Sequence, residues 1–408
     1  MDFIGFLWIL VWSGMFSSPS SVQFPVSLMQ PVAFFQGTRA LYPVLAAYLC
    51  LIWIFFSQKR LMPPLKTPLG AIFYYCLVGM TASMFLSPSK YTALYWGAVY
   101  VSPILVMWIS LNHANAMAYL RKLIYLNYII AIGIVISLLP EAFRMDISTP
   151  PFGRTYDLPF NLGGIRVNGA GRFALVAIIV SFVRLISQKE KKRYLWLPLI
   201  LSSLFLIIQT QSRTALLGLS VAGILFIYLK GLDRRLLFVG PTVAFVIWLS
   251  GYKWRAQGQI EKLLYLSGRE YTWKKGIELF KESPIFGSGF HADRLLLDSQ
   301  HMHNSYFHSM VQSGALGTIF FLGAMIGIWA LIFRSNLLKK VRYVEGRDQT
   351  LLIESVLILG FLTTRSFFES TAAFYGVDLL LFIPAMTYIY LWIRTNAAAQ
   401  QSDQQLEK

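Results

Sequence analysis

Long apolar runs recur along the whole chain, and they restrict it to a fold in which helices cross a bilayer. A helix needs about 17–25 mostly apolar residues to span the hydrocarbon region. Only 13% of the 408 residues are charged, against about 25% in soluble domains. The sequence therefore predicts an all-α polytopic membrane protein, with a single integral membrane domain over 1–408. Twelve candidate spans cover residues 3–21, 38–56, 68–87, 91–111, 123–139, 170–186, 194–210, 213–229, 235–251, 311–333, 350–366 and 374–393.

Basic residues in the loops predict how these spans are oriented. Lys and Arg are concentrated in every second loop, including "SQKR" at 57–60, "QKEKKR" at 188–193 and the segment 334–348. Cytoplasmic loops of membrane proteins carry this excess. Both termini are therefore expected in the cytoplasm, and the two long segments 140–169 and 252–310 on the outer side. The net charge of +17 has this source and, we expect, a second one in a site for an anionic ligand.

The segment 252–310 is the longest polar stretch, and its composition predicts a folded loop. Its middle part, "YTWKKGIELFKESPIFGSGF", places Trp273, Ile277 and Phe280 at helical spacing. This pattern predicts an amphipathic helix that stops at Ser283-Pro284. Long loops in membrane and soluble proteins are usually functional or disordered, and we expect this one to be functional.

Ionisable residues from distant parts of the chain fall on the predicted outer side. Arg213 begins a span, Arg269 and His303 lie in the long loop, and Arg365 and Glu369 lie at the turn between the last two spans. An arginine near hydrocarbon is costly, by about 2.5–3.5 kcal/mol at mid-bilayer. Their common side predicts a site at the outer membrane interface.

Arg213 and Arg269 each have an alternative interpretation. Arg213 stands between Ser212 and Thr214 in "QTQSRTALLG" and begins a helix, which is a good arrangement for holding phosphate. It could instead extend to the lipid headgroups. Arg269 in "SGREYTW" could be a solvated loop charge, although Gly268 and Trp273 favour a shaped turn.

Four of the five histidines fall between 291 and 308, and His303 is the candidate general base among them. It could instead cap the helix that begins near Asn304. His301 and His303 form an H-x-H pair that could hold a metal. No acidic D-x-D pair stands nearby and Asp293 is isolated in sequence, so we expect no metal.

Charges near the last two spans also leave alternatives open. Arg365 and Glu369 are four residues apart and would pair with each other on a continuous helix. Asp378 lies inside the last candidate span and needs a partner, for which Arg365 is a candidate.

Three stretches, in this order, carry a resemblance to a known family. "QSRTALLG", "SGREYTWKKGIELFKESPIFGSGF" and "HMHNSYFHSMVQSGALGTIFFL" resemble the superfamily of O-antigen ligases and O-antigen polymerases, over about residues 209–322. These are bacterial inner-membrane glycosyltransferases of the C type. The N-terminal half matches them only as a hydrophobic pattern.

The resemblance implies the chemistry and the site. The donor would be an oligosaccharide on a polyprenyl diphosphate, usually undecaprenyl diphosphate, at a site facing the periplasm. Arg213 and Arg269 would engage the diphosphate, and His303 would orient or deprotonate the acceptor hydroxyl. Transfer would invert the anomeric carbon without a metal or another cofactor. Arg365 and Asn304 are further candidates for substrate binding.

One stretch departs from the ligase pattern. "TTRSFFES" is more similar to exopolysaccharide polymerases. Glu369 then becomes a second candidate base, or a ligand for a sugar hydroxyl.

Three functions compete on the sequence. The first is a polymerase of O-antigen, capsule or exopolysaccharide repeat units. The second is a ligase that moves the glycan to a lipid A core. The third, a lipid or saccharide transporter, would place ionisable residues near the midplane of repeated halves, which this sequence lacks. Membrane lipids and the glycan substrates are the expected partners, with a flippase and a chain-length regulator for a polymerase, and no nucleic acid.

Overall fold

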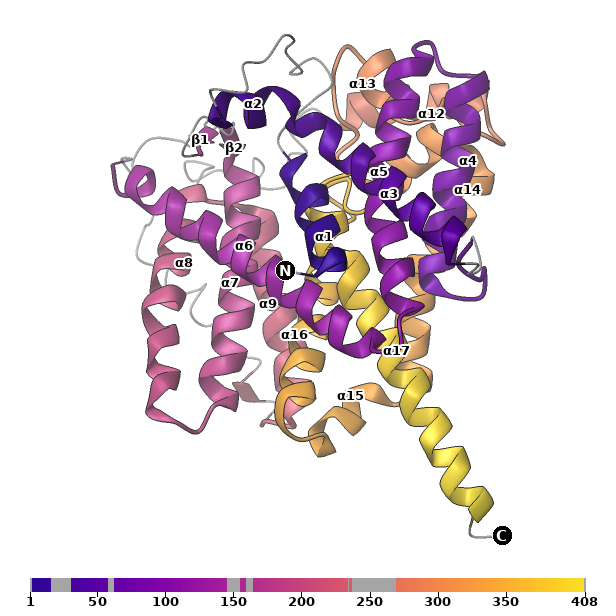
Figure 1. Cartoon of the computed structure of the whole chain (residues 1–408). Coiled ribbons are helices and arrows are strands. Elements are labelled where there is room, and N and C mark those ends of the chain that lie inside the picture. The colour runs from indigo at the N-terminus through magenta and orange to yellow at the C-terminus, as the bar shows by residue number, and fades with distance from the viewer. Residues whose placement is uncertain are drawn as a thin grey trace. The chain divides into compact units, whose positions relative to one another are not determined.

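The structure, a computed structural model, describes residues 2–15, 31–57, 62–144, 155–158, 164–233, 235–236 and 269–406 (Figure 1). It is helical apart from one short antiparallel ribbon, in which Tyr156 of β1 (Thr155–Asp157) faces Ile165 of β2 (Gly164–Arg166). The chain forms two compact units, which are described separately. Unit 1 comprises Met1–Tyr125, Arg269–Leu337 and Ser366–Lys408, and unit 2 comprises Leu126–Gly268 and Leu338–Arg365.

Nine helices in the described part are long and apolar enough to cross a membrane. The prediction of an all-helical, multi-pass membrane protein is confirmed at this level, but the count of twelve spans is not shown. The first predicted span is a shorter helix, α1 (Phe3–Ser13). The eleventh corresponds to α16 (Gly346–Arg365), which is not among the nine. The ninth, 235–251, lies almost wholly outside the described residues.

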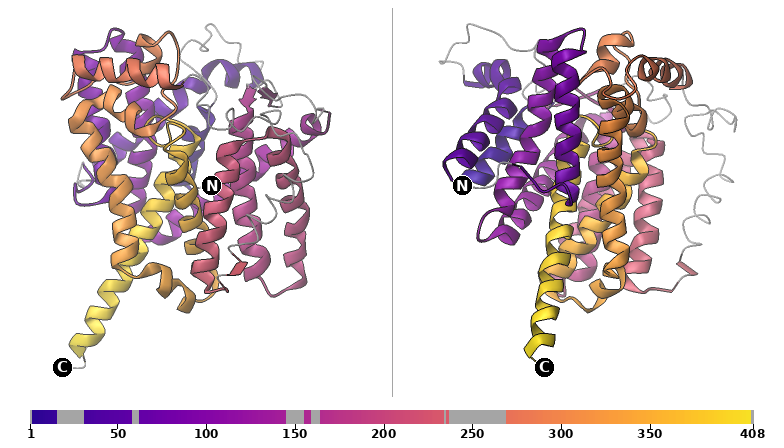
Figure 2. Two further views of the ribbon diagram at one scale, coloured as in Figure 1. Left: turned by 180° about the vertical axis from the view of Figure 1, so that it is seen from behind. Right: turned by 90° about the vertical axis from the view of Figure 1, so that its right-hand side faces the viewer.

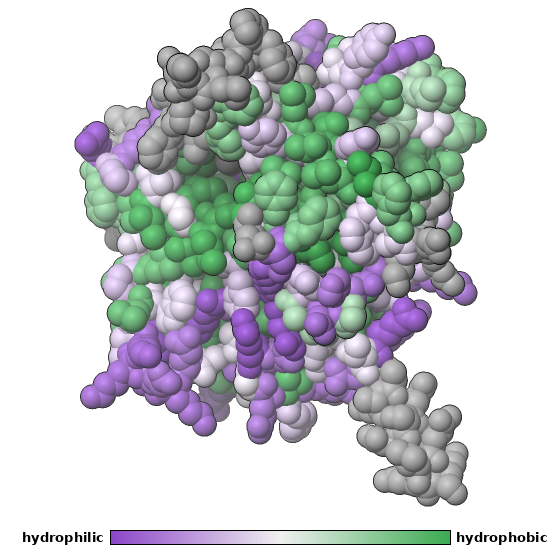
Figure 3. Space-filling model, in the orientation of Figure 1, coloured by the Kyte–Doolittle hydropathy of each residue, from purple (hydrophilic) through white to green (hydrophobic). Residues whose placement is uncertain are grey.

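Apolar side chains also cover the outside of these helices, as a lipid-facing surface requires. On α3 (Tyr42–Phe56), Tyr48, Phe55 and Phe56 are exposed to 61%, 73% and 78%. Figure 3 shows the apolar surface that such side chains form on one face of the molecule. A soluble protein rarely exposes large contiguous apolar patches, so this surface agrees with the hydropathy of the sequence.

Unit 1 is built around the pair α4 (Pro68–Phe85) and α14 (Ser305–Arg334), which lie side by side (Figure 2). The helix α5 (Lys90–Leu111) packs on α4, and α12 (Arg269–Glu282) packs on α14. The other elements of unit 1 are α1, α2 (Pro31–Thr38), η2 (Arg39–Leu41), α3, α5 (Lys90–Leu111), the start of α6 (Ala116–Arg144), α12 (Arg269–Glu282), α13 (Ala292–Leu296) and α17 (Val377–Leu406).

Unit 2 pairs α7 (Val167–Ser187) with α8 (Trp196–Thr210), and α9 (Arg213–Lys230) with α16. Gly218 of α9 allows close packing, because a Cβ there would lie 2.4 Å from the ring of Phe361. The short elements of this part of the chain are η4 (Lys191–Leu195), α15 (Leu337–Lys340), which begins at the boundary between the units, and η6 (Val341–Tyr343).

The helix α14 is interrupted at Gly314. Gly314 has φ 61 and ψ −165, which interrupts the helix. The segment 284–289 crosses the break and takes over its hydrogen bonds: Ala315 N donates to Pro284 O at 2.8 Å, and Gly289 N donates to Gln312 O at 2.9 Å. At Gly287, φ is +72 and a Cβ would lie 2.5 Å from the backbone of Gly314. Only glycine fits such an approach, which explains the sequence "PIFGSGF".

Candidate functional site

The amphipathic helix predicted in the long loop is present as α12, and it is held against the segment that leads into α14. Trp273 donates its indole N–H to the carbonyl of Met302 at 2.8 Å. Gly276 lies against the same residue, since a Cβ there would meet the methyl group of Met302 at 2.3 Å. These contacts place the first residue of α12, Arg269, at a fixed position beside the start of α14.

The start of α14 is joined to the chain segment before α17 by several hydrogen bonds. Ser305 Oγ is 3.0 Å from the carbonyl of Glu369 and 2.8 Å from that of Thr371. Asn304 Nδ2 donates to the carbonyl of Phe367 at 3.0 Å. Two segments more than sixty residues apart therefore form one rigid corner in unit 1.

Asn304 has a second task at this corner. Its side-chain oxygen accepts the backbone N–H groups of Tyr306 at 2.9 Å and Phe307 at 3.1 Å, so it is the N-cap of α14. Such a cap satisfies amide groups that have no partner within the helix. Asn304, and not His303, is therefore the residue that caps α14.

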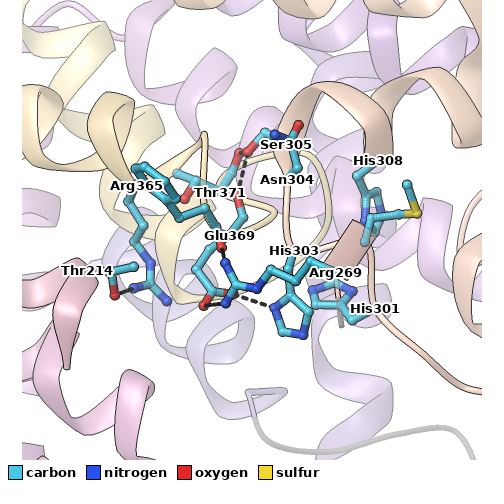
Figure 4. A network of polar contacts seen from close by, with 12 residues as sticks. Thr214, Arg269, His301, His303, Asn304, Ser305, His308, Arg365, Glu369 and Thr371 are labelled. Carbon is cyan, nitrogen blue, oxygen red and sulfur yellow. Dashed lines mark hydrogen bonds and ion pairs between the residues drawn. The ribbon is translucent and has the colours of Figure 1, made fainter. Parts of the chain in front are cut away.

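Glu369 joins Arg269 and His303 in one network (Figure 4). Its Oε2 lies 2.8 Å from His303 Nδ1, and its Oε1 lies 3.3 Å from Arg269 Nη2. Arg269 also donates from Nη1 to the carbonyl of Phe368. The carboxylate side chain is 10% exposed, while the imidazole is 32% exposed. The carboxylate is therefore enclosed, and the ring of His303 keeps an accessible edge.

The geometry of His303 suits a general base. A glutamate is ordinarily ionised at neutral pH and then accepts hydrogen bonds only. Nδ1 of His303 must donate to it, so Nε2 carries the lone pair that can take a proton. The backbone of His303 has φ 48, in the left-handed region. Such conformations in residues other than glycine are strained and occur at functional sites.

A second carboxylate–histidine cluster lies beside the first, and the sequence reasoning missed it. Asp293, isolated in the sequence, is 1% exposed, and its Oδ2 lies 2.8 Å from His301 Nδ1 and 3.3 Å from His308 Nδ1. Burial would raise the pKa of Asp293, but the two histidines outweigh it and the pKa is lowered. Burial lowers the pKa of His301 to about 4. A buried ion next to neutral imidazoles is the result.

The H-x-H pair therefore divides between two carboxylates. His301 is bonded to Asp293 and His303 to Glu369, although the two rings lie side by side, with centroids 5.1 Å apart. Among the described residues, one group has the residue types of a metal site: ligand atoms of Asp293, His301 and His308 lie within 4.8 Å of one another. His303 is not part of that group.

Arg213 and Arg365 belong to unit 2, and the structure places them near one residue. Arg213 is the first residue of α9, whose N-cap is Ser212. Arg365 is the last residue of α16, is 5% exposed, and donates from Nη1 to Thr214 Oγ1 at 3.1 Å. Within unit 2 the end of α16 is thus bonded to the start of α9 through Arg365 and Thr214 (Figure 4), and Arg213 precedes Thr214 in the sequence.

The structure contradicts the pairing of Arg365 with Glu369 on one helix, and it gives Asp378 a partner. α16 ends at Arg365, so no continuous helix carries both Arg365 and Glu369. Asp378 lies in the first turn of α17, at the start of the candidate span Val377–Ala397, and its Oδ2 accepts the hydroxyl of Thr371 at 3.1 Å. A carboxylate in the first turn is favourable because it faces the positive end of the helix dipole.

Comparison with known proteins agrees with the resemblance in the sequence. Residues 197–322 match the family model described as O-antigen ligase. The exopolysaccharide production protein ExoQ of Rhizobium meliloti (strain 1021) is 26% identical over 183 residues, which cover 37% of this chain and 42% of that protein. The chain thus spans less than half the length of this curated relative. The resemblance to the O-antigen ligase and polymerase superfamily is confirmed for this part of the chain.

Proposed function

We propose that this chain is a membrane glycosyltransferase that polymerises saccharide repeat units carried on a polyprenyl diphosphate, at the outer face of the inner membrane. The observation that carries the proposal is the contact of His303 with Glu369, with Arg269 on the other carboxylate oxygen. This arrangement provides an oriented base next to a fixed cation, as transfer to a hydroxyl from a diphosphate requires.

The proposed step is a displacement at the anomeric carbon of the donor. The acceptor hydroxyl oxygen forms the new bond to that carbon, and the bond from the carbon to the diphosphate oxygen breaks. Nε2 of His303 takes the hydroxyl proton, and Glu369 stabilises the imidazolium that results. The lipid diphosphate leaves with the electron pair, and the configuration at the carbon is inverted.

Arginine chemistry fits the leaving group. Negative charge increases on the diphosphate as the bond breaks, and a guanidinium that is already fixed stabilises it most in the transition state. Arg269 is fixed by its contacts with Glu369 and the carbonyl of Phe368. The role of Arg213 as a second phosphate ligand, and those of Arg365 and Asn304 in substrate binding, rest on the sequence.

We propose a polymerase rather than a ligase for two reasons. One relative is named for exopolysaccharide production, and "TTRSFFES" supplies the Glu369 that pairs with His303. The alternative is a ligase that transfers the glycan to a lipid A core, which the description of the matched family supports. Both would use the same donor and base, and they differ in the acceptor.

The deciding experiment supplies purified full-length protein with the lipid diphosphate-linked oligosaccharide extracted from the producing cells. With donor alone, a polymerase gives a ladder of longer lipid-linked glycans on a gel. His303→Ala should remove the ladder, whereas His113→Ala, a histidine in the turn before α6, should leave it unchanged.

Other outcomes would assign another function. No ladder, but transfer once a lipid A core is added, would identify a ligase. A protein that binds the lipid-linked donor, transfers no glycan to either acceptor and moves the donor across a vesicle bilayer would be a transporter, and the glycosyltransferase proposal would be wrong.

A further inference from the structure

Next to His303, unit 1 contains a cavity of about 470 Å³ that the proposed mechanism does not use. This volume lies in the range of small-molecule sites, about 300–1,000 Å³. Its walls come from α5, from the segment around α13, from the start of α14 and from the segment before α17. They include Trp96, His291, Asp293, His301, His308 and Phe374.

Aromatic rings form two walls of the cavity. Trp96 is stacked on His291, with centroids 4.9 Å apart and an interplanar angle of 13°. On the other side, Phe374 contacts His308 face to face and His301 edge to face, at 5.5 and 4.9 Å. Flat rings with electron-rich faces suit the polarised C–H groups of a pyranose, for the same electrostatic reason that aromatic edges pack on aromatic faces.

The polar groups of the walls are rigidly placed. His291 has φ 66, and its backbone N–H donates to Gln312 Oε1 at 3.2 Å. The amide of Gln312 in turn donates to Tyr75 and to the carbonyl of Ala373, both at 2.7 Å. A strained residue held by a buried network indicates preorganisation for a ligand.

One buried side chain at the cavity has unmet hydrogen-bonding capacity. His308 is 2% exposed, and among the described residues neither ring nitrogen has a hydrogen-bond partner of good geometry. Buried polar groups are nearly always satisfied. A hydroxyl that both donates and accepts would satisfy the ring of His308 and an oxygen of Asp293 at once.

The charges at the cavity favour a neutral ligand over the diphosphate. Asp293 and Arg294 carry opposite charges. Burial lowers the pKa of His291 to about 4, and it lowers the pKa of His301 to about 4 as well. At neutral pH both rings are then uncharged. A cavity with one buried anion and two neutral imidazoles offers polar contacts without a net positive field.

We propose that this cavity binds a neutral pyranose of the acceptor glycan, with Trp96 as the stacking platform and Asp293 and His308 as ligands for sugar hydroxyls. The inference rests on the proposed function, because it is the position of His301 beside His303 that connects the cavity with the reacting hydroxyl. Trp96 is then a residue that determines acceptor affinity and leaves the donor unaffected.

A metal ion is the competing explanation of the same cluster, and the distances are less suitable for it. Ligand atoms around tetrahedral zinc lie about 2.0–2.2 Å from the ion when they are nitrogen or oxygen, which separates them by more than a hydrogen bond. His301 Nδ1 and Asp293 Oδ2 are 2.8 Å apart, an ordinary hydrogen-bond distance.

The test uses a probe that can serve as the glycan acceptor but not as the glycan donor. The probe is the repeat-unit oligosaccharide of the producing cells on a fluorescent alkyl group, without diphosphate. Trp96→Leu should raise the KM for this probe by about tenfold or more, because the flat stacking surface is lost, while the KM for the lipid-linked donor stays within about twofold. Trp96→Phe should restore most of the affinity.

Two further variants control this result. Tyr91→Leu changes an aromatic residue of the same helix that is 92% exposed, and it should alter neither KM. Phe374→Leu removes the opposite wall and replaces Trp96→Leu if that variant does not fold. Unchanged probe KM in both cavity variants, with turnover retained, would overturn the acceptor site and leave the glycosyltransferase proposal standing.

If the wild-type protein transfers no glycan at all, the proposed function fails and binding is tested directly. Saturation-transfer NMR with the same oligosaccharide should then give a signal in the wild type that Trp96→Leu abolishes. Absence of any signal would overturn the inference. One equivalent of zinc retained by the purified wild type and lost in Asp293→Asn would also overturn it, in favour of a metal site.

Discussion

Two arginine–glutamate pairs, one in each unit, have similar distances and different surroundings. In unit 2, Arg184 Nε lies 2.9 Å from Glu354 Oε1, and the carboxylate side chain is fully buried. The rings of Tyr128 and Trp196 cover the guanidinium at 5.6 and 5.2 Å. This pair is enclosed by helices α6, α7 and α16 and the start of α8, and it joins elements that pack against one another.

In unit 1, the pair between Arg269 and Glu369 has a third member. The second oxygen of the carboxylate bonds to His303, whose ring is partly exposed. A buried pair by itself is weak evidence for either stability or function. In the proposed mechanism the oriented imidazole, rather than the ion pair, distinguishes the unit 1 network from the structural contact in unit 2.

The largest expected effect follows from breaking the unit 1 network. Glu369→Gln should lower kcat by about 100-fold or more, because the amide neither fixes the tautomer of His303 nor stabilises its charged form. Glycan transfer by purified protein measures this. Glu282→Gln, at the exposed end of α12, is the matched control. Activity near the wild-type level in Glu369→Gln would remove Glu369 from the mechanism.

A comparable loss is expected at Arg213, the proposed second ligand of the diphosphate. Arg213→Ala should reduce kcat/KM for the lipid-linked donor by about 100-fold, and Arg213→Lys should also be poor, since a point charge does not replace the bidentate guanidinium. Protein levels in the membrane should stay normal. Arg213→Lys with full activity would mean that only positive charge is needed there.

A substitution in the unit 2 pair should lower the stability of the protein and leave its activity unchanged. Glu354→Gln leaves Arg184 with a neutral partner inside a helical bundle and should cost about 2–4 kcal/mol of folding free energy. The kcat of the folded fraction should not change. Thermal unfolding in detergent and activity per folded molecule measure the two parts; a lower kcat with unchanged stability would contradict the distinction between the pairs.

Replacing both members of each arginine–glutamate pair by apolar residues tests the difference between the two units further. Arg184→Met with Glu354→Leu should recover most of the lost stability, because a buried ion pair can often be replaced by apolar groups. Arg269→Met with Glu369→Leu should recover no activity. Recovery of glycan transfer in the second double variant would show that both pairs are structural.

The smallest effect is a pH dependence of stability. Folding lowers the pKa of His291 and His301 from 6.5 to about 4. Between these values the unfolded chain binds protons that the folded protein does not, so stability is full above about pH 6.5 and declines as the pH falls toward 4. The lowered pKa of Asp293 adds a further loss below about 3.8. A melting temperature that does not change between pH 7 and 4 would contradict this.

The sequence predicted the parts of the molecule that depend on local pattern. Apolar length predicted most spans, and the spacing of Trp273, Ile277 and Phe280 predicted α12, which ends at Glu282, directly before Ser283-Pro284. It also made His303 and Arg269 candidates, through their place on the predicted outer side and the resemblance to O-antigen ligases and polymerases, and their roles stay predictions.

The partners of these residues could not be read from the sequence. Glu369 meets His303 only because Ser305 and Asn304 bind the segment before α17. His301 and His303 would share one side of an extended chain, but the left-handed backbone at His303 directs the two rings to different carboxylates. Pairing across tens of residues depends on tertiary structure, which a single sequence does not show.

The break in α14 at Gly314 also defines the length of helix that can cross the bilayer. From Ala315, whose amide is capped by the carbonyl of Pro284, the helix continues to Arg334. At 1.5 Å per residue this part is about 30 Å long, the thickness of a bilayer's hydrocarbon core. With Arg334 at one headgroup layer, Ala315 would lie at the opposite layer, and the part of α14 before the break continues from there to the corner of Asn304 and His303. The proposed lipid-anchored diphosphate would stay in the leaflet at that end, and such a substrate would reach the site by moving in two dimensions.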